Sequence, residues 1–222
     1  MTAVPAGVPL PSLTPTQQAA VAKLAYAVES PGAVTVLCGP AGVGKTLVLD
    51  HLAAAPALRD RSVCRSSARE GVPAADGLTA CDAGILFVDD AHDAADGELA
   101  TLCDAWRRLD PRAGLVLAGE GRLLTLLSRD VRLERAVVLR AVLAPFLRAE
   151  SRAAAIGRLA GAVPGSDLEA VVDRIHDIAG GIPAEVIRLA EFTRVLAAAA
   201  PGRHVAPDDV ELLHRRLHLQ AA

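Results

Sequence analysis

One eight-residue segment, Gly39 to Thr46, constrains this chain more than any other. It reads Gly-Pro-Ala-Gly-Val-Gly-Lys-Thr and matches the pattern G-x-x-x-x-G-K-[ST] in full. An apolar run, 34–38, precedes the segment and a helix-like stretch, 46–55, follows it. The order strand, glycine loop, helix is the context in which this pattern forms a phosphate-binding loop. The sequence therefore predicts an α/β fold that binds a nucleotide.

The residue types of the loop indicate how phosphates would be held. Glycines let the backbone turn so that its N–H groups point inward, and the N-terminus of the following helix points at the same charge. Lys45 would reach the β- and γ-phosphates, and the Thr46 hydroxyl would ligate Mg²⁺. The chain has only two lysines, so the lysine at this position is informative. The predicted nucleotide-binding residues are Gly39, Pro40, Ala41, Gly42, Val43, Gly44, Lys45 and Thr46.

A second segment, 84–90, reads Gly-Ile-Leu-Phe-Val-Asp-Asp. Its consecutive apolar residues favour a buried strand of a parallel sheet, and two carboxylates at the end of such a strand are costly unless they serve a purpose. The aspartates could simply begin a helix. Downstream of a phosphate-binding loop, however, the pattern is typical of a Walker B motif. Asp89 would then hold Mg²⁺, and Asp90 would orient the attacking water.

The composition indicates which nucleotide the protein binds and in which compartment it is expected. The chain has no asparagine, so it lacks the N-K-x-D element that reads guanine, and ATP with Mg²⁺ is the expected pair of cofactors. A net charge of −3 does not favour a nucleic-acid coating protein, although it does not exclude a local basic face that binds DNA. No apolar run approaches the ~18 residues of a membrane span, and residues 1–13 show no secretion signal. We expect a cytoplasmic protein whose four cysteines are reduced and buried.

The pattern of elements changes near Pro145. Strand and helix patterns alternate before it, and only helix patterns follow it. The predicted fold is α/β, a P-loop NTPase with a mainly parallel sheet of about five strands flanked by helices and followed by a small all-helical lid. We expect a flexible N-terminus at 1–13, an α/β nucleotide-binding core at 14–146 and the lid at 147–222.

The expected elements follow from hydrophobic periodicity and from helix start signals. Thr14, Pro15 and Gln17 form the sequence signature of a capped helix start. Core helices are expected at 14–30, 46–55, 96–109 and 122–128. Strands are expected at 34–38, 61–65, 84–90, 115–119 and 136–143. Lid helices are expected at 149–162, 166–179, 184–199 and 207–219.

Together these features resemble an AAA+ ATPase, and most nearly the ATPase domain of the ExeA/GspA type, which is related to origin-recognition and transposition ATPases. Beyond the segments quoted above, Leu-Val-Leu-Ala-Gly-Glu (115–120), Val-Leu-Ala-Pro-Phe (142–146) and Ala-Gly-Gly-Ile-Pro (179–183) carry the resemblance. It implies a module that couples ATP binding and hydrolysis to a change of conformation or assembly. It also implies a homo-oligomer, with a protein partner that the sequence does not name.

The resemblance also assigns catalytic residues and shows departures. Glu120 takes the place of a polar sensor residue, and Arg135 lies one position from the arginine that such ATPases donate to a neighbouring subunit. Relatives carry glutamate where this chain has Asp90, and an arginine where it has Ala184, with Arg188 one turn further along. The implied catalytic set is Asp90, Glu120 and Arg135, and the departures imply slow hydrolysis.

Two other functions stay open at this stage. One is an ATP-gated interaction or regulatory protein with little or no turnover, in which ATP only sets the conformation. The other, which the sequence favours less, is a small-molecule kinase, because no acceptor-binding segment is recognisable between the two Walker motifs.

Overall fold

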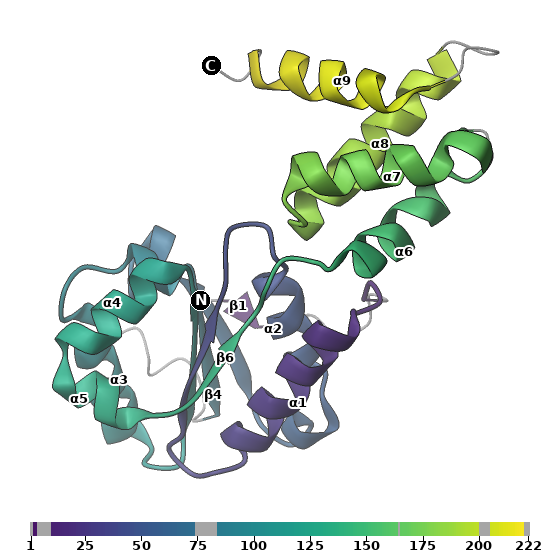
Figure 1. Cartoon of the computed structure of the whole chain (residues 1–222). Helices are drawn as coiled ribbons and strands as arrows, with labels where there is room; N and C mark the ends of the chain where they lie inside the picture. Colours follow the sequence, from purple (N-terminus) through teal and green to yellow (C-terminus); the bar gives the residue numbers. More distant parts are fainter. Residues whose placement is uncertain (1, 4–9, 74–83, 164, 200–204, 220–222) are drawn as a thin grey trace. The chain divides into compact units, whose positions relative to one another are not determined.

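The computed structural model of the chain describes residues 2–3, 10–73, 84–163, 165–199 and 205–219. The chain forms two compact units, Met1–Ala144 and Pro145–Ala222, here called the core unit and the helical unit (Figure 1). The helices and strands of the two units are described separately.

The core unit is built on one sheet, whose strands follow the order β1-β3-β4-β5-β2-β6. The five longer strands are parallel to one another, and among the described strands only the short β1 is antiparallel, against β3. The α/β fold with a mainly parallel sheet is therefore confirmed. The strands are β1 (Thr2–Ala3), β2 (Val34–Cys38), β3 (Val63–Ser67), β4 (Ile85–Asp89), β5 (Gly114–Gly119) and β6 (Val137–Val142).

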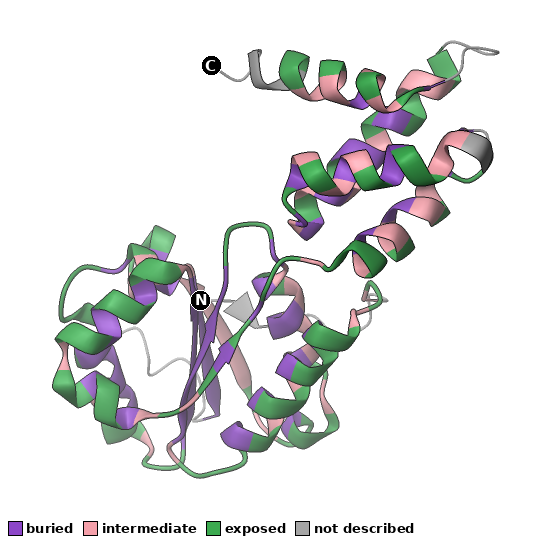
Figure 2. Ribbon diagram, in the orientation of Figure 1, coloured by how far each residue is buried: buried purple, intermediate pink, exposed green. Residues whose placement is uncertain are grey.

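Helices cover both faces of the sheet and bury its central strands. Every residue of β2, β4 and β5 is buried (Figure 2), because each of these strands has a neighbour on both sides and helices above and below. On the first face the core includes Leu24 and Leu49, and on the second it includes Leu99 and Trp106. The helices are α1 (Pro15–Val28), α2 (Lys45–Ala53), α3 (Glu98–Leu109), α4 (Gly121–Arg129) and α5 (Val131–Ala136).

Local signals explain where these helices begin. The expected capping box is present: the Thr14 N–H donates to Gln17 Oε1 at 3.1 Å, and the Gln17 N–H donates to Thr14 Oγ1 at 3.4 Å.

Trp106 is buried on α3, and its Nε1–H donates to the Gly114 carbonyl at 2.9 Å. This bond gives the indole N–H an acceptor, without which it would be an unpaired polar group in the core.

Three details differ from the sequence-based expectations. The strand β3 begins two residues later than 61–65, because its pairing with β4 begins at Val63, and the Arg61 side chain donates to the carbonyls of Val28, Gly84 and Arg112. Helix α5 was not expected, since six residues are too few to show periodicity. Cys38 and Cys103 are buried and free, as expected, whereas Cys64 is disulfide-bonded and that expectation is wrong.

The N-terminal segment and the loop after β3 are described only in part. Thr2 and Ala3 pair with Arg65 and Cys64. The flexibility expected for residues 1–13 stays a prediction. The segment 74–80, which the sequence indicates as loop, lies outside the described residues.

The helical unit has its own hydrophobic core, to which Leu159, Ile175 and Leu189 contribute. Between α7 and α8 the backbone turns at Gly180 and Gly181, whose φ angles are +57° and +71°. Among the described helices, none combines the length and the apolar character needed to cross a membrane. The helices are α6 (Arg148–Leu159), α7 (Gly165–Ala179), α8 (Pro183–Ala199) and α9 (Pro207–Leu219).

Candidate functional site

The predicted nucleotide-binding segments lie at one edge of the sheet. The glycine loop follows β2, Asp89 ends β4 and Glu120 follows β5, and these three strands are parallel neighbours. Their carboxyl ends therefore meet, and the Gly39 N–H donates to the Gly119 carbonyl at 3.1 Å. In open α/β sheets, ligands bind in the crevice outside the carboxyl ends of the strands.

The backbone of the loop requires glycine at two positions for different reasons. At Gly44, φ is +98°, and an added Cβ would lie 2.6 Å from the Gln17 side-chain nitrogen. At Gly39, an added Cβ would lie 2.8 Å from the Leu143 carbonyl oxygen. Helix α2 begins at Lys45, directly after the loop, and it has no side-chain cap. Its first N–H groups are therefore left without a side-chain acceptor. This geometry forms an anion-binding helix N-terminus.

Lys45 lies over the loop, and only 8 % of it is exposed. Its ammonium donates to the carbonyls of Gly39 at 2.9 Å and of Pro40 at 3.0 Å. An ammonium has three protons, so one donor remains for a phosphate oxygen. The loop carbonyls thus hold this charge against the glycine loop, and its contact with the β- and γ-phosphates stays a prediction.

The two expected ligands of Mg²⁺ are in contact. The Thr46 hydroxyl donates to Asp89 Oδ2 at 2.8 Å, although the residues are far apart in the sequence. In octahedral coordination at about 2.0–2.1 Å, adjacent ligand oxygens lie roughly 2.9 Å apart, so these two oxygens fit neighbouring positions around Mg²⁺. Both are hard oxygen donors of the kind that Mg²⁺ prefers.

Asp90 occupies a strained backbone position beside the metal ligand. Its φ is +51°, the only positive value of a non-glycine residue among those described, and its N–H donates to Asp89 Oδ1 at 3.0 Å. Its carboxylate accepts a hydrogen bond from the Ser67 hydroxyl at 3.3 Å and lies 3.9 Å from Arg69 Nε. Ser67 ends β3, and nothing in the sequence pattern indicates that it reaches Asp90.

Glu120 lies at the same edge and is partly exposed. Its Oε1 is 3.6 Å from Nε2 of His92, a side chain that is mostly buried in the short helix η4 (Ala91–Asp93). Arg122 donates to the carbonyls of His92 and Ala94 and so ties this short helix to α4. The structure therefore places Glu120 beside the segment that follows β4, with His92 as its neighbour, and its catalytic role stays a prediction.

Gln17 joins the loop to α1, a contact that the capping signature does not reveal. Its side-chain N–H donates to the Val43 carbonyl at 3.2 Å, while its Oε1 accepts from Thr14. One buried amide thus caps a helix and fixes the phosphate-binding loop.

Replacing Gln17 with alanine should destabilise the core unit by about 1–2 kcal/mol, because a cap is lost and a buried carbonyl loses its donor. Denaturant unfolding would measure the loss. Gln18→Ala is the matched control, since the Gln18 side chain is exposed and donates to the Leu13 carbonyl at 3.2 Å. Equal stabilities of the two variants would contradict this role for Gln17.

Three arginines near the end of the core unit differ in their contacts. Arg129 lies 3.6 Å from Asp96, and Arg132 pairs with Asp130 at 3.0 Å. The hydrogen bond from Arg132 lowers the pKa of the Asp130 carboxyl. Arg135 is exposed on α5, and within the described part of the chain no hydrogen bond or ion pair engages its side chain. Of the three, Arg135 is the one whose guanidinium is not already paired.

The position at which the resemblance implies an arginine lies in the helical unit. Ala184 is in the first turn of α8, and Arg188 follows on the same helix. Arg188 donates to Glu185 at 2.5 Å.

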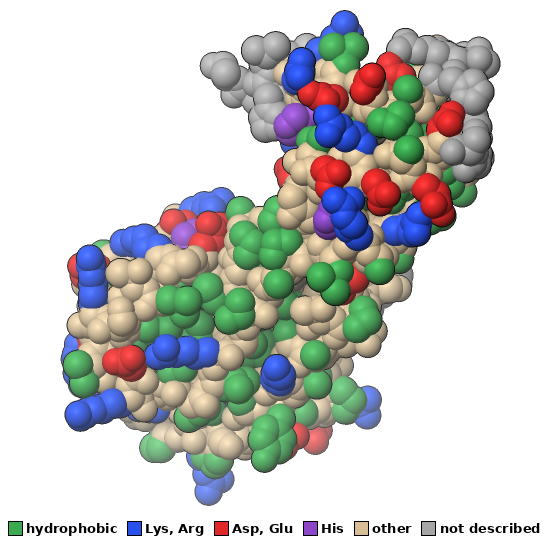
Figure 3. All heavy atoms as spheres, viewed as in Figure 1, with side chains coloured by type: hydrophobic (Ala, Val, Ile, Leu, Met, Phe, Trp, Pro, Cys, Tyr) green, Lys and Arg blue, Asp and Glu red, His purple; other side chains and the backbone are tan. Residues whose placement is uncertain are grey.

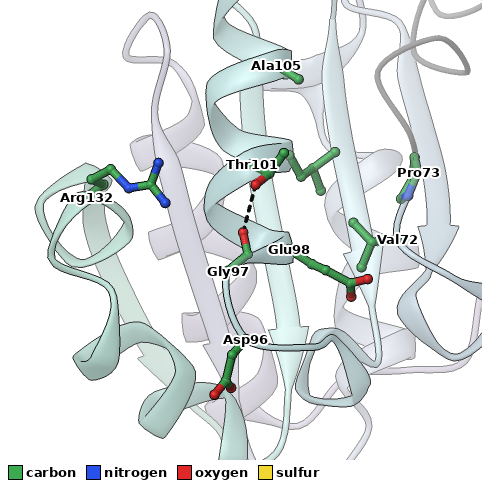
Figure 4. A pocket seen from close by; sticks show the side chains of 9 residues that line it. Val72, Pro73, Asp96, Gly97, Glu98, Thr101, Ala105 and Arg132 are labelled. Carbon is green, nitrogen blue, oxygen red and sulfur yellow. Dashed lines mark hydrogen bonds between the residues drawn. The ribbon is translucent and has the colours of Figure 1, made fainter.

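A separate pocket of about 460 Å³ lies beside the start of α3 (Figure 4). Val72, Glu98, Thr101 and Arg132 contribute to its wall, and no residue of the glycine loop does. In Figure 4 the chain beyond Pro73 runs into a segment that is not described, so the pocket carries no functional assignment.

The fold of the chain is similar to that of several solved structures. The chain is similar to the RuvB Holliday junction branch migration motor of Thermotoga maritima, with 17 % identity and a TM-score of 0.64 over 87 % of this chain and 66 % of that one. It is also similar to the ORC1 protein of Aeropyrum pernix, solved in complex with DNA, with 17 % identity and a TM-score of 0.66 over 93 % of this chain and 66 % of that one. This chain thus spans slightly less than two thirds of each.

A third similar structure is the ORC2 protein of Aeropyrum pernix, solved as ADPNP and ADP complexes. The identity is 16 % and the TM-score 0.65, over 91 % of this chain and 68 % of that one. The sequence matches no protein-family model and no curated protein. The strand order, the glycine loop and these structural likenesses agree, and the chain has the fold of the AAA+ P-loop ATPases.

Proposed function

We propose that this protein is an AAA+ module that binds ATP with Mg²⁺ and hydrolyses it slowly, coupling the nucleotide to a change of conformation or assembly. The observation that carries the proposal is the contact of Thr46 Oγ1 with Asp89 Oδ2 at 2.8 Å, directly beside the glycine loop. Calorimetric titration of the full chain with ATP, with and without Mg²⁺, tests it. A chain that binds no adenine nucleotide would contradict the proposal.

Each residue of the site has a distinct part in the proposed reaction. The N–H groups of the loop and Lys45 bind the phosphates, and Thr46 and Asp89 hold Mg²⁺. When bound, Mg²⁺ neutralises charge on the phosphate oxygens. Asp90 orients water for in-line attack, and Glu120 assists from the end of β5.

Asp90 is the reason to propose slow hydrolysis. Aspartate is one methylene shorter than the glutamate of related ATPases, so its carboxylate should fall about an ångström short of the water. Asp90 also accepts a hydrogen bond from Ser67, which holds it toward β3. Either effect would keep the Asp90 carboxylate from orienting the attacking water well.

Asp90→Glu should therefore raise the single-turnover rate of ATP hydrolysis by up to about 100-fold, since misplacement on this scale costs about that factor. Asp90→Asn should abolish hydrolysis and leave ATP binding in place. Asp93→Asn is the matched control, because Asp93 lies in the short helix that follows Asp90 and its carboxylate pairs with Arg69 at 3.4 Å. An Asp90→Asn chain that hydrolyses at the native rate would move the catalytic role to Glu120.

The contact of Asp90 with Ser67 also favours a second candidate function, an ATP-gated interaction protein with little turnover. In that case, ATP binding alone would set the conformation. Turnover measured with and without added DNA or protein partner separates the two, because a slow ATPase would be stimulated and a gated binder would not. The net charge of −3 gives no support to DNA as the partner.

The proposed assembly is a homo-oligomer in the cytoplasm, with the helical unit acting as a lid. Support for self-assembly comes from the sheet edge, where β6 has a strand neighbour on one side only among the strands that the structure describes. Val138 and Val142 of this strand are 60 % and 66 % exposed. Figure 3 shows hydrophobic side chains gathered on the face of the core unit where β6 lies. Exposed apolar side chains on an edge strand are a liability unless another surface covers them.

A further inference from the structure

An arginine side chain reaches the proposed metal site from the neighbouring strand. Arg65 lies in the middle of β3, and its Nη2 is 3.3 Å from Asp89 Oδ2. The same nitrogen donates to the Thr46 carbonyl at 3.4 Å. The guanidinium therefore contacts both residues that are proposed to hold Mg²⁺.

A second carboxylate anchors this guanidinium from the other side. Arg65 Nη1 donates to Asp50 Oδ1 at 2.5 Å, and Asp50 lies on α2, the helix that follows the glycine loop. The Arg65 side chain is only 20 % exposed, which makes this three-residue ion network largely buried. Buried charges of this kind are retained only when they are paired.

The network gives Asp89 a permanent counter-charge. Asp89 is 9 % exposed, and a carboxylate buried to this extent is costly unless a cation or hydrogen bonds compensate its charge. Arg65 supplies that cation on Oδ2, the oxygen that also accepts from the Thr46 hydroxyl. The guanidinium and an incoming Mg²⁺ would thus share one carboxylate oxygen and repel each other.

We propose that Arg65 is a positioning residue that partly replaces Mg²⁺ and so reduces the dependence of nucleotide binding on the metal. In the absence of Mg²⁺, Arg65 neutralises Asp89, which would otherwise repel the phosphates. When Mg²⁺ is present, Arg65 opposes its binding and keeps its bond to Asp50. The inference rests on the nucleotide site proposed above and concerns its regulation by Mg²⁺.

The test measures the affinity of the full chain for ADP, a nucleotide that is not turned over, by calorimetry in saturating Mg²⁺ and in EDTA. The quantity compared is the dissociation constant in EDTA divided by the dissociation constant in saturating Mg²⁺, so a larger ratio means a stronger dependence of binding on the metal. Arg65→Gln removes the guanidinium charge, so this ratio should rise about tenfold or more above that of the native chain. Arg65→Lys keeps a cation and should restore most of the native ratio.

Two further variants separate this role from a merely structural one. Arg69→Gln removes the same charge from the exposed short helix η2 (Ala68–Glu70) without touching Asp89, and its ratio should stay native. Asp50→Asn leaves Asp89 as the remaining carboxylate partner of Arg65, so Arg65 should oppose Mg²⁺ binding at Asp89 more strongly. The ratio should therefore fall below that of the native chain. The opposite signs expected for Arg65→Gln and Asp50→Asn cannot arise from general destabilisation.

The outcomes distinguish the inference from the function on which it rests. If the native chain binds ADP and the ratio of Arg65→Gln equals the native one, Arg65 does not act on the metal and the inference is overturned. If Arg65→Gln fails to fold, as circular dichroism would show, Asp50→Asn decides, and an unchanged or raised ratio overturns the inference. A native chain that binds ADP in neither condition would remove the nucleotide proposal itself.

Discussion

Replacing Lys45 with alanine is expected to weaken ATP binding by about 100-fold, since hydrogen bonds to charged groups contribute roughly 1.5–3 kcal/mol each. The ammonium is held over the loop by the carbonyls of Gly39 and Pro40, with one proton left for a phosphate oxygen. Alanine removes both the charge and that donor. The measurement is calorimetric titration with ATP and Mg²⁺.

The chain supplies its own control for this experiment. Lys23, the other lysine, is exposed on α1 and away from the loop, so Lys23→Ala should bind ATP like the native chain. Thermal unfolding of both variants would show that the fold is retained. Unchanged affinity in Lys45→Ala, with Lys23→Ala for comparison, would end the nucleotide proposal in its present form.

Replacing Arg135 with alanine is expected to lower ATP turnover by about 10³-fold or more and to leave ATP affinity unchanged, because an arginine finger donated in trans acts on the transition state in a neighbouring subunit. Arg135 is exposed and unpaired among the described residues, whereas Arg129 and Arg132 already face carboxylates. Steady-state turnover and calorimetric binding together separate the two effects. Arg129→Ala is the matched control.

A mixing experiment tests whether Arg135 acts on the site of a neighbouring subunit. Subunits carrying Lys45→Ala should bind ATP poorly but still present Arg135, and subunits carrying Arg135→Ala should bind ATP but lack the finger. Mixing them should restore part of the lost turnover if each site is completed by its neighbour. If Arg135→Ala hydrolyses ATP normally, Arg132→Ala becomes the next candidate. If that variant is also normal, or the chain stays monomeric with ATP, the trans arrangement is wrong.

The sequence predicted the central strands and the glycine loop well, because both depend on local signals. Consecutive apolar residues in 34–38 and 85–88 mark strands that are buried on both faces. The loop is defined by the residue types that its backbone and its ligand require. The capped start of α1 was equally readable from Thr14 and Gln17.

The contacts that complete the site could not be read from the sequence, because they join segments that only the tertiary fold brings together. Ser67 and Arg65 lie two residues apart on one strand, yet the first contacts Asp90 and the second contacts Asp89. Alternation along β3 puts both on the same face, but only the pairing of β3 with β4 places that face beside the Walker B aspartates. Helix α5 was missed because six residues are too few to show periodicity, and because its capping residue, Asp130, follows directly on α4.

The single tryptophan of the chain makes the core unit optically distinct from the helical unit. Trp106 is buried between α3 and β5 with its indole N–H bonded to Gly114, and the helical unit contains no tryptophan. Indole emission therefore reports on the packing of the core unit alone, while far-ultraviolet circular dichroism reports mainly on helices, which both units contain. The two signals together can follow each unit in one sample without any added label.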